Sequence, residues 1–499
     1  ISSLNYIIYR LSIFSILVNK DATLYFGEIM KLVTSIKLIS LLFITFLSFV
    51  PASYAADSEL LNLDITTSLP AIIALMVFAL AYMFVMAEEY THLRKSKPVV
   101  VAAGIIWAIV AYMAVKMGFD THSASYAFKH TFLEFAELFG FLLVAMTFIN
   151  TMTERNVFES LRSWLVGQGF TFRKIFWITG VLSFFMSPIA DNLTTALIMC
   201  AVVMAVGKNN TKFIGLACIN IVVAANAGGA FSPFGDITTL MVWQKGVVTF
   251  TEFFYIFVPS VVNYIVPAAI MHFAISDEKP EASKEKVTVK YGGYTVIFLF
   301  LGTISFTVIQ HQFLHLPPVF GMMTGLGVLS IYGYHLKSKE SKDKNRKSIF
   351  NIFNMVSKAE WDTLLFFYGV LMCVGGLSAF GYMALTASFM YVDLGASTAN
   401  ILVGILSAIV DNIPVMFAVL TMMPQMDLGQ WLLVTLTAGV GGSMLSIGSA
   451  AGVALMGQTK GIYTFFTHLK WTPVIILGYA ASIAVHFLWN ATLFDGVPL

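Results

Sequence analysis

The sequence is poor in charged residues. Asp, Glu, Lys and Arg make up only 11% of its 499 residues, whereas soluble domains carry about 25%. Hydrophobic residues make up 58%. This composition excludes an ordinary soluble domain and predicts a polytopic membrane protein. The formal net charge is +2, and no basic stripe contains interleaved aromatic residues, so nothing indicates a nucleic-acid partner.

Cysteine is also scarce, and signatures of nucleotide binding are missing. The three cysteines lie in apolar segments without the spacing of a metal site, so we interpret them as packing residues. The sequence contains no Walker-type phosphate loop, so we do not expect ATP hydrolysis by this chain. We therefore expect neither an enzyme nor a resident cofactor.

The first sixty residues need a separate interpretation. Residues 1–29 precede the first methionine, and we interpret them as an extension that is not part of the native protein. Residues 30–55 combine a basic start, a short apolar run and small residues, which predicts a secretory signal peptide cut after Ala55. The alternative is an uncleaved extra helix. In either case, the chain from residue 56 onward would begin outside the cytoplasm.

Eight segments are apolar and long enough, at about 20 residues, to cross a bilayer as helices. They are about 69–87, 98–117, 131–152, 250–275, 294–312, 317–336, 362–383 and 472–492.

The distribution of Lys and Arg predicts the orientation of these spans. Basic residues cluster at 94–97, 155–174, 279–290 and 337–347, and the positive-inside rule places these loops in the cytoplasm. The long interval after Lys358 contains no Lys or Arg until Lys460, so we expect its loops outside. Lys245, on the outer side of the segment 213–245, opposes the crossing expected for that segment.

Four longer apolar segments are interrupted. Residues 175–207 have Ser-Pro in the middle and basic flanks, which predicts a re-entrant helical hairpin open to the cytoplasm. Residues 213–245 are broken by GGAFSPFG and are expected to cross as an unwound helix. Residues 397–425 are expected to form a second hairpin, open to the outside, and residues 430–460 are broken by GVGGSMLSIG.

The predicted fold is therefore an all-α polytopic membrane protein with two inverted-topology repeats, at 69–275 and 294–492. Each repeat contains one re-entrant hairpin and one broken transmembrane helix, and a cytoplasmic linker at 276–293 joins them. This arrangement gives ten crossings. Paired Gly- and Pro-interrupted helices indicate the binding site of a secondary transporter.

An acid followed by an amide stands at each predicted hairpin tip. The residues SPIADN recur as SAIVDN, which places Asp191-Asn192 and Asp411-Asn412 in apolar surroundings with no Lys or Arg nearby in sequence. An Asp at a helix centre costs about 2.5–3.5 kcal/mol on insertion scales. The alternative is that each Asp only caps the following helix. We predict that the two tips face each other near the bilayer midplane and share one site for a small hard cation, which prefers oxygen ligands.

Further polar residues surround the breaks. Asn226, Asp236, Thr238 and Thr239 flank the first broken helix, and Ser446 and Ser449 occupy the second. Asp236 precedes a half-helix, where N-capping is the alternative to ion binding. Thr194 and Thr195 follow the first tip, where the second has Pro414 and Val415; bonding to helix carbonyls and ion binding both remain open for them.

Two acids and two histidines lie further from the breaks. Glu137 and Asp362 occupy matching positions in the two halves, where a proton relay or charge balance is the functional interpretation and a helix-end location the alternative. His130 and His92 could tune activity with pH or simply be interfacial histidines.

Competition at the acids suggests a mechanism. A buried carboxylate holds a proton more readily than an exposed one, so near neutral pH it can carry either a proton or a metal ion. If the two exclude each other and only occupied states cross the membrane, exchange of one for the other is obligatory.

Three motifs together, 187–195 (SPIADNLTT), 228–243 (GGAFSPFGDITTLMVW) and 407–415 (SAIVDNIPV), resemble the NhaD-type sodium/proton antiporters of bacterial inner membranes, within the ion transporter superfamily. The similarity runs from about residue 60 to the C-terminus. It implies export of Na⁺ or Li⁺ in exchange for H⁺, favoured at alkaline pH and serving pH homeostasis. It also implies scaffold and transport subdomains, a homodimer, and an inner-membrane location with a periplasmic mature N-terminus.

The family's important polar positions are carried over motif by motif. They fall on Ser187, Asp191, Asn192, Thr194, Asn226, Asp236, Thr238, Thr239, Ser407, Asp411, Asn412, Ser446 and Ser449, with Glu137 and Asp362 in support.

The main alternative is an anion transporter of the same superfamily, carrying a dicarboxylate, citrate or arsenite. Related dicarboxylate carriers have Ser-Asn-Thr at the hairpin tips, which suits an anion, whereas two aspartates would repel one. A channel or a non-transporting scaffold would not need two acidic hairpins.

Overall fold

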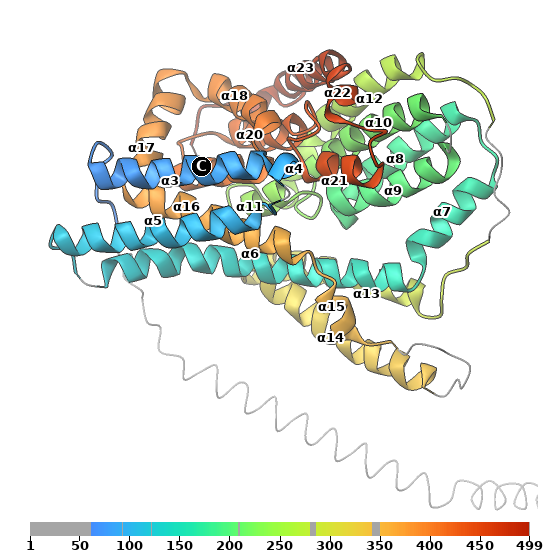
Figure 1. The fold of residues 1–499 in the computed structure, drawn as a ribbon, viewed down its shortest axis with the longest axis horizontal. Coiled ribbons are helices and arrows are strands. Elements are labelled where there is room, and N and C mark those ends of the chain that lie inside the picture. The colour runs from blue at the N-terminus through green and yellow to red at the C-terminus, as the bar shows by residue number, and fades with distance from the viewer. Residues whose placement is uncertain are drawn as a thin grey trace, which may run out of the picture. The chain divides into compact units, whose positions relative to one another are not determined.

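The computed structural model describes residues 61–91, 93–120, 122–207, 210–279, 286–341 and 350–498, and every regular element in them is a helix (Figure 1). The predictions for residues 1–29 and 30–55 lie outside these residues. The all-α fold class is confirmed. Apolar composition gives the reason: a backbone surrounded by lipid must satisfy its hydrogen bonds within its own segment, as a helix does.

Nine helices in the described ranges are long and apolar enough to cross a membrane. They are α3 (Leu69–Met86), α5 (Ser96–Lys116), α6 (Ser123–Glu154), α10 (Thr211–Ala230), η1 with α12 (Glu252–His272), α13 (Gly293–Leu314), α14 (Pro318–Glu340), α16 (Trp361–Ala379) and α23 (Thr472–Trp489).

All eight simple spans expected from the sequence correspond to helices of this set, and α10 forms the first part of the expected crossing at 213–245. The expected crossing at 430–460 is not among the nine. The reason is its break: α20 (Leu428–Gly441) stops after 14 residues, which is too short to span a bilayer as one helix.

The helix interruptions fall in all four of the segments where the sequence predicts them. The two predicted hairpins correspond to the pair α8 (Phe172–Ala190) and α9 (Asn192–Gly207) and the pair α18 (Ala396–Ile409) and α19 (Asn412–Met422). The two broken helices are the pair α10 and α11 (Ile237–Gln244) and the pair α20 and α21 (Ala450–Gln458). Shorter helices complete the described chain: α4 (Glu88–Thr91), α7 (Val157–Gly167), η1 (Glu252–Ile256), α12 (Phe257–His272), α15 (Ile352–Ser357), α17 (Tyr382–Ala387), η2 (Ser388–Asp393), α22 (Phe465–Leu469) and η3 (Ala491–Leu493).

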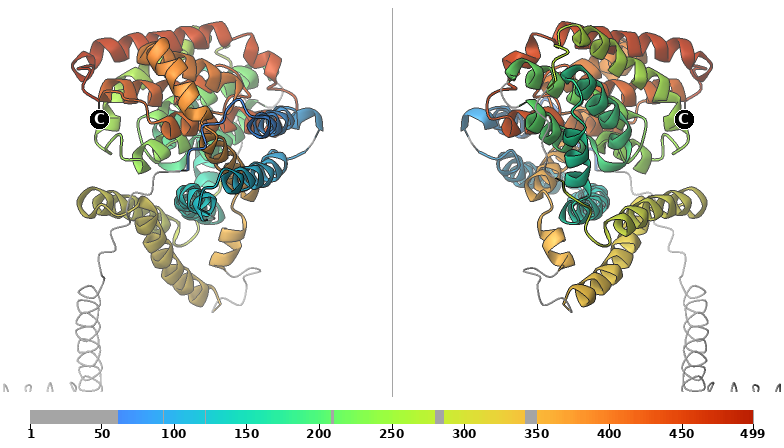
Figure 2. Two further views of the ribbon diagram at one scale, coloured as in Figure 1. Left: turned by 90° about the vertical axis from the view of Figure 1, so that its left-hand side faces the viewer. Right: turned by 90° about the vertical axis from the view of Figure 1, so that its right-hand side faces the viewer.

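The helices from residue 69 onward pack in two sets. In the first set, α5 packs on α16 and α3, and α14 packs on α13 and α6. Figure 2 (left) shows α3, α5 and α6 nearly end-on, with their axes side by side. In the second set, α8 packs on α9 and α10, α18 packs on α20, and α12 packs on α23.

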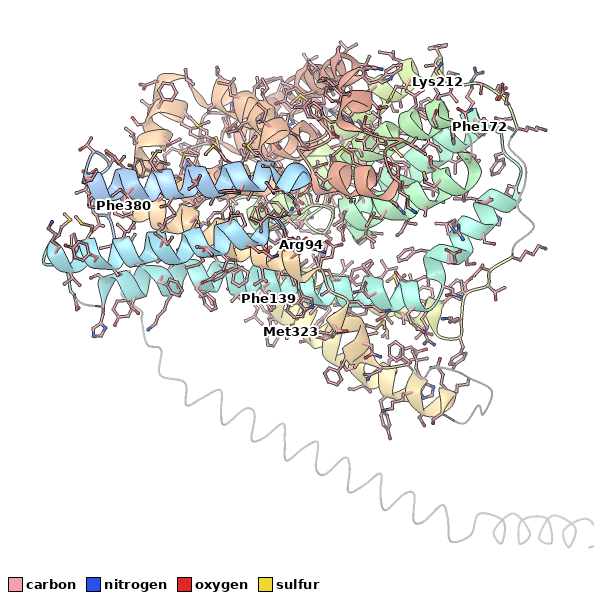
Figure 3. All side chains as sticks on the ribbon, viewed as in Figure 1. Arg94, Phe139, Phe172, Lys212, Met323 and Phe380 are labelled. Atoms are coloured by element: carbon pink, nitrogen blue, oxygen red, sulfur yellow. The ribbon has the colours of Figure 1, made fainter. Side chains whose placement is uncertain are left out.

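Burial differs widely among the candidate membrane spans. The helix α10 is buried along its whole apolar length, whereas α3 is buried along only 17% of it. Figure 3 shows Phe172, at the start of α8, and Lys212, at the start of α10, at the same end of the molecule, while Arg94 lies near its middle, just before α5. The buried helix α10 thus carries its broken end into the interior of the described chain.

Candidate functional site

The helix interruptions converge on one cavity of about 130 Å³. Asp191 and Asn192 reach it from the junction of α8 and α9, Asp411 and Asn412 from the junction of α18 and α19, and Asp236 from the break before α11. Chain segments far apart in sequence therefore place three carboxylates and two amides around a single space. Two lysines, Lys95 and Lys358, and the carboxylate of Glu360 also line it.

Pairs of glycines shape both broken helices. A Cβ atom on Gly229 would lie 2.6 Å from the carbonyl oxygen of Gly235, and a Cβ atom on Gly442 would lie 2.6 Å from that of Gly448. Each unwound loop folds back on the helix that precedes it, so a side chain at either position would collide with backbone. The glycine-rich sequences are therefore what permits the two breaks.

Asp236 joins three segments of the site. Its Oδ2 accepts hydrogen bonds from Nδ2 of Asn192 at 2.7 Å and from Nδ2 of Asn412 at 3.0 Å, and its Oδ1 accepts one from the backbone N–H of Thr238 at 3.0 Å. Asp236 is therefore the N-cap of α11, as the alternative interpretation proposed. It also links the amides that follow Asp191 and Asp411, and this hub function was not foreseen from the sequence.

Asn226 extends the same network to the second broken helix. Its Oδ1 accepts a hydrogen bond from Nδ2 of Asn192 at 3.0 Å, and its Nδ2 donates to Oγ of Ser449 at 3.1 Å. The Ser449 hydroxyl in turn accepts a bond from the backbone N–H of Gly452 and caps α21. The hydrogen-bond network thus connects all four helix interruptions.

Asp191 caps the helix that follows it. Its backbone has a positive φ of 58°. Its Oδ1 accepts the backbone N–H of Thr194 at 2.7 Å, and its Oδ2 accepts the Thr194 hydroxyl at 2.9 Å. The Thr194 hydroxyl therefore donates to a carboxylate rather than to a helix carbonyl. In the described chain the neighbouring hydroxyl of Thr195 is buried without a partner.

Asp411 makes no such capping bond. The residue that corresponds to Thr194 is Pro414, which has neither a backbone N–H nor a hydroxyl. Oδ1 of Asp411 is buried with no hydrogen-bond partner among the described residues, and Oδ2 lies 3.5 Å from Nζ of Lys95. Sequence reasoning assigned Lys95 only to a cytoplasmic basic cluster, and no local signal connects it with Asp411.

Several predicted hydroxyls hold the backbone around the breaks. Ser187 donates to the carbonyl of Gly235, Ser407 to that of Ala438, and Thr239 to those of Ser232 and Asp236. The hydroxyls of Thr238 and Ser446 are buried and lack a partner within the described ranges.

Among the remaining predicted residues that the structure describes, Asp362, Glu137 and His130 do not line the cavity. Asp362 stands in the first turn of α16 and accepts a hydrogen bond from the hydroxyl of Ser96. Glu137 lies on α6 and lines a second cavity, and His130 lines a neighbouring one. His92 lies outside the described residues.

The second cavity contains the charge that opposed the predicted topology. Nζ of Lys245, at the end of α11, lies 2.7 Å from Oε1 of Glu134 on α6. Both residues also line the space next to Glu137. This ion pair gives Lys245 a counter-charge, which the positive-inside rule does not take into account.

An apolar helical bundle with interrupted helices around a buried polar cavity defines the class of multi-pass membrane transporters. A family model described as "Citrate transporter" (CitMHS) matches residues 65–439. The chain is 55% identical over 471 residues to the Na⁺/H⁺ antiporter NhaD of Vibrio cholerae, which covers 91% of this chain and 98% of that protein. It is 54% identical over 451 residues to NhaD of Alkalimonas amylolytica, covering 87% and 93%.

A more distant relative, sodium/proton antiporter 1 of Arabidopsis thaliana, is 33% identical over 432 residues, covering 82% of this chain and 71% of the relative. The chain therefore belongs to the NhaD Na⁺/H⁺ antiporters, within the CitMHS family. It is a transporter and not an enzyme, and the resemblance seen in the three sequence motifs is confirmed.

Proposed function

We propose that this chain exports Na⁺ and Li⁺ in exchange for H⁺, and that cation and proton compete for Asp191 and Asp411. The observation that carries this proposal is that both carboxylates line one cavity whose third acid, Asp236, already accepts three hydrogen bonds. The carboxylate of Asp411, in contrast, has a buried oxygen with no partner in the described structure. Asp236 thus organises the site, and the carboxylates of Asp191 and Asp411 bind the cation and the proton in turn.

The amides supply further oxygen atoms. Asn192 and Asn412 both donate their NH₂ groups to Asp236, so the carbonyl oxygen of each amide remains available to a cation. Small hard cations such as Na⁺ prefer oxygen ligands of this kind. The arrangement therefore supports a cation site built from two carboxylates and two amide carbonyls.

The exchange needs no covalent step. A cation that binds at the carboxylates removes their protons by competition, and a proton that returns removes the cation. If the site changes sides of the membrane only when a cation or protons occupy it, the export of each cation requires the entry of protons. Dissipation of the proton gradient is then the direct signature of the activity.

We further propose that the two halves are inverted repeats, each with a re-entrant hairpin. Matching helix contacts support this proposal: α3–α5 corresponds to α13–α14, α5–α16 to α14–α6, α8–α10 to α18–α20, and α9–α21 to α19–α11. In both halves, a glycine near the end of the broken helix also lies close to the backbone of the first hairpin arm. A Cβ atom on Gly228 would lie 2.1 Å from the carbonyl oxygen of Phe184, and one on Gly441 would lie 2.1 Å from that of Gly404.

The orientation proposed for the chain is the one that its basic loops predict, with the mature N-terminus in the periplasm and the protein in the bacterial inner membrane. The cavity that contains Asp191 and Asp411 is also lined by Lys95 and Lys358, which belong to or adjoin those basic segments. This supports a cavity that faces the cytoplasm. The homodimer, and the parts of Glu137, Asp362 and His130 in proton transfer or pH tuning, remain predictions.

Citrate transport is the second candidate, because the matching family model carries that description. The cavity opposes it: the lining contains four carboxylates, of Asp191, Asp236, Glu360 and Asp411, against two lysines. A polyvalent anion would have to overcome this excess of negative charge in a site that is partly shielded from water.

The decisive experiment uses everted membrane vesicles that carry a proton gradient, with addition of NaCl, LiCl, KCl or citrate at pH 7 and pH 9. We expect Na⁺ and Li⁺ to dissipate the gradient, more strongly at pH 9. A vesicle preparation that contains Asp411→Asn at equal expression serves as the control. A response to citrate alone would contradict the proposal and make the cavity an anion site.

A further inference from the structure

Lys95 is the basic side chain in contact with the carboxylate of Asp411. It immediately precedes α5, next to Arg94, which Figure 3 shows near the middle of the molecule. Its Nζ lies 3.5 Å from Oδ2 of Asp411 and 4.5 Å from the centroid of the Phe366 ring on α16. The two charged side chains are only 20% and 13% exposed.

The contact between the two charges is loose. An optimal ammonium–carboxylate bond measures about 2.7–2.9 Å, and this one is longer, at 3.5 Å. Oδ1 of Asp411 is meanwhile buried and without a partner in the described chain. Lys95 therefore balances the charge of Asp411 without saturating its hydrogen-bonding capacity.

Phe366 gives the ammonium group a second favourable contact besides Asp411. The ring is fully buried, and the face of an aromatic ring attracts a cation. The flexible stem of Lys95 lets its Nζ shift along this surface while it stays charged. The side chain can thus leave the carboxylate without being transferred to apolar surroundings.

We propose that Lys95 is a tethered internal cation that occupies Asp411 when no sodium is bound and that a sodium ion must displace. This inference rests on the proposed function, because it assigns a competitor to the cation site. Two positive charges near one carboxylate repel each other, so Lys95 lowers the affinity for sodium and sets the concentration range in which the transporter responds. Lys95 therefore sets the affinity of the site rather than forming part of the cation's ligand shell.

The test compares Lys95→Gln with Lys95→Arg and Lys358→Gln in the purified full chain. Two quantities are measured at pH 9: the sodium concentration that gives half-maximal thermal stabilisation, and the one that gives half-maximal exchange in proteoliposomes. We expect Lys95→Gln to lower both by about tenfold, because it removes a positive charge next to the ion. Lys95→Arg keeps the charge and should stay near the wild type.

Lys358 is the matched control, since it lines the same cavity but is exposed. Its substitution should change the half-maximal concentration by less than about twofold, because solvent screens exposed charges. Lys95→Met, which keeps an apolar stem over Phe366, provides a second neutral variant in case Lys95→Gln folds poorly.

A purely structural role for Lys95 predicts a different result. The neutral variants would then melt at a lower temperature without sodium, while the half-maximal sodium concentration would not change. This result would overturn the proposal. Weaker sodium binding in Lys95→Gln would also overturn it, and so would an equal effect of Lys358→Gln. Failure of the wild type to respond to sodium would instead contradict the proposed function.

Discussion

The two acid–amide motifs look alike in sequence but differ in structure. Asp191 accepts two hydrogen bonds from Thr194 and caps α9, whereas Asp411 makes no capping bond and contacts Lys95. One residue accounts for most of this difference. The position three residues after Asp191 is Thr194, which offers a backbone N–H and a hydroxyl, while the position three residues after Asp411 is Pro414, which offers neither.

This difference shows how a repeated motif can provide two unlike ligands. A carboxylate that holds two local donors is fixed in place, and a cation that binds it must compete with those donors. A carboxylate without donors from its own helix keeps one oxygen free, but it needs a counter-charge, and Lys95 supplies one at the other oxygen. We infer that Asp191 gives the site its geometry and Asp411 gives it a readily available oxygen.

The strongest test of this comparison neutralises each acid. Asp411→Asn and Asp191→Asn should both abolish exchange, because removing one charge from a buried charged site costs about 2–5 kcal/mol, which is a factor of about thirty to several thousand in affinity. Sodium-driven dissipation of the proton gradient measures the effect. Asp393→Asn, at an exposed position in η2, should behave like the wild type.

Expression of all three variants should match the wild type, since an amide can replace either carboxylate without a change of shape. Full activity in one of the two site variants would remove that carboxylate from the mechanism and would decide which of the two motifs binds the ion.

A smaller but still large effect is expected at the hub between the two motifs. Asp236→Asn replaces one acceptor oxygen with an NH₂ group, although Asp236 accepts N–H groups on both oxygens. At least one buried donor then loses its partner, which should cost about 1–3 kcal/mol of stability. Thermal unfolding in detergent and vesicle exchange should both decline.

Asp427→Asn is the matched control for that variant, because Asp427 caps α20 and accepts two N–H groups away from the cavity. It should lower the melting temperature and leave exchange unchanged. Wild-type exchange in Asp236→Asn would show that the linkage between the two amides is dispensable.

A third substitution removes the difference in hydrogen-bond donors between the two acid–amide motifs. Pro414→Thr should give Asp411 the same N–H and hydroxyl donors that Asp191 has, and a new N-cap bond is worth about 0.5–2 kcal/mol. We expect a higher melting temperature without sodium and a higher sodium concentration for half-maximal stabilisation, because the ion then competes with local donors.

Pro414→Ala separates these effects, since it restores the backbone N–H without the hydroxyl. Its shift should lie between those of the wild type and Pro414→Thr. Equal sodium responses in all three proteins would mean that local donors do not control access to Asp411.

Much of this site can be predicted from the sequence. Carboxylates in apolar segments are costly, so Asp191 and Asp411 stand out. Glycine-rich or Ser-Pro interruptions locate three of the four breaks, and the recurrence of Asp-Asn, followed by Pro414, locates the break at Asp411. The difference between Thr194 and Pro414, three residues after the two acids, is also visible in the sequence. Periodicity and hydropathy describe one segment at a time, however, so they could not reveal that Asp236 links two amides or that Lys95 reaches Asp411.

The smallest effect is expected at the other lysine–acid pair, Lys245–Glu134, which sharpens the contrast with Lys95. Its side chains are 32% and 30% exposed, and the pair lies outside the cavity formed by the breaks. Partly exposed ion pairs contribute about 0.2–1 kcal/mol, so Glu134→Gln should lower the melting temperature slightly and leave the sodium response unchanged. Because Glu137 lines the same space, Glu137→Gln should be measured beside it. A loss of exchange in Glu134→Gln would place this second cavity on the transport path and would make its ion pair, like that of Lys95, one that has to open during the cycle.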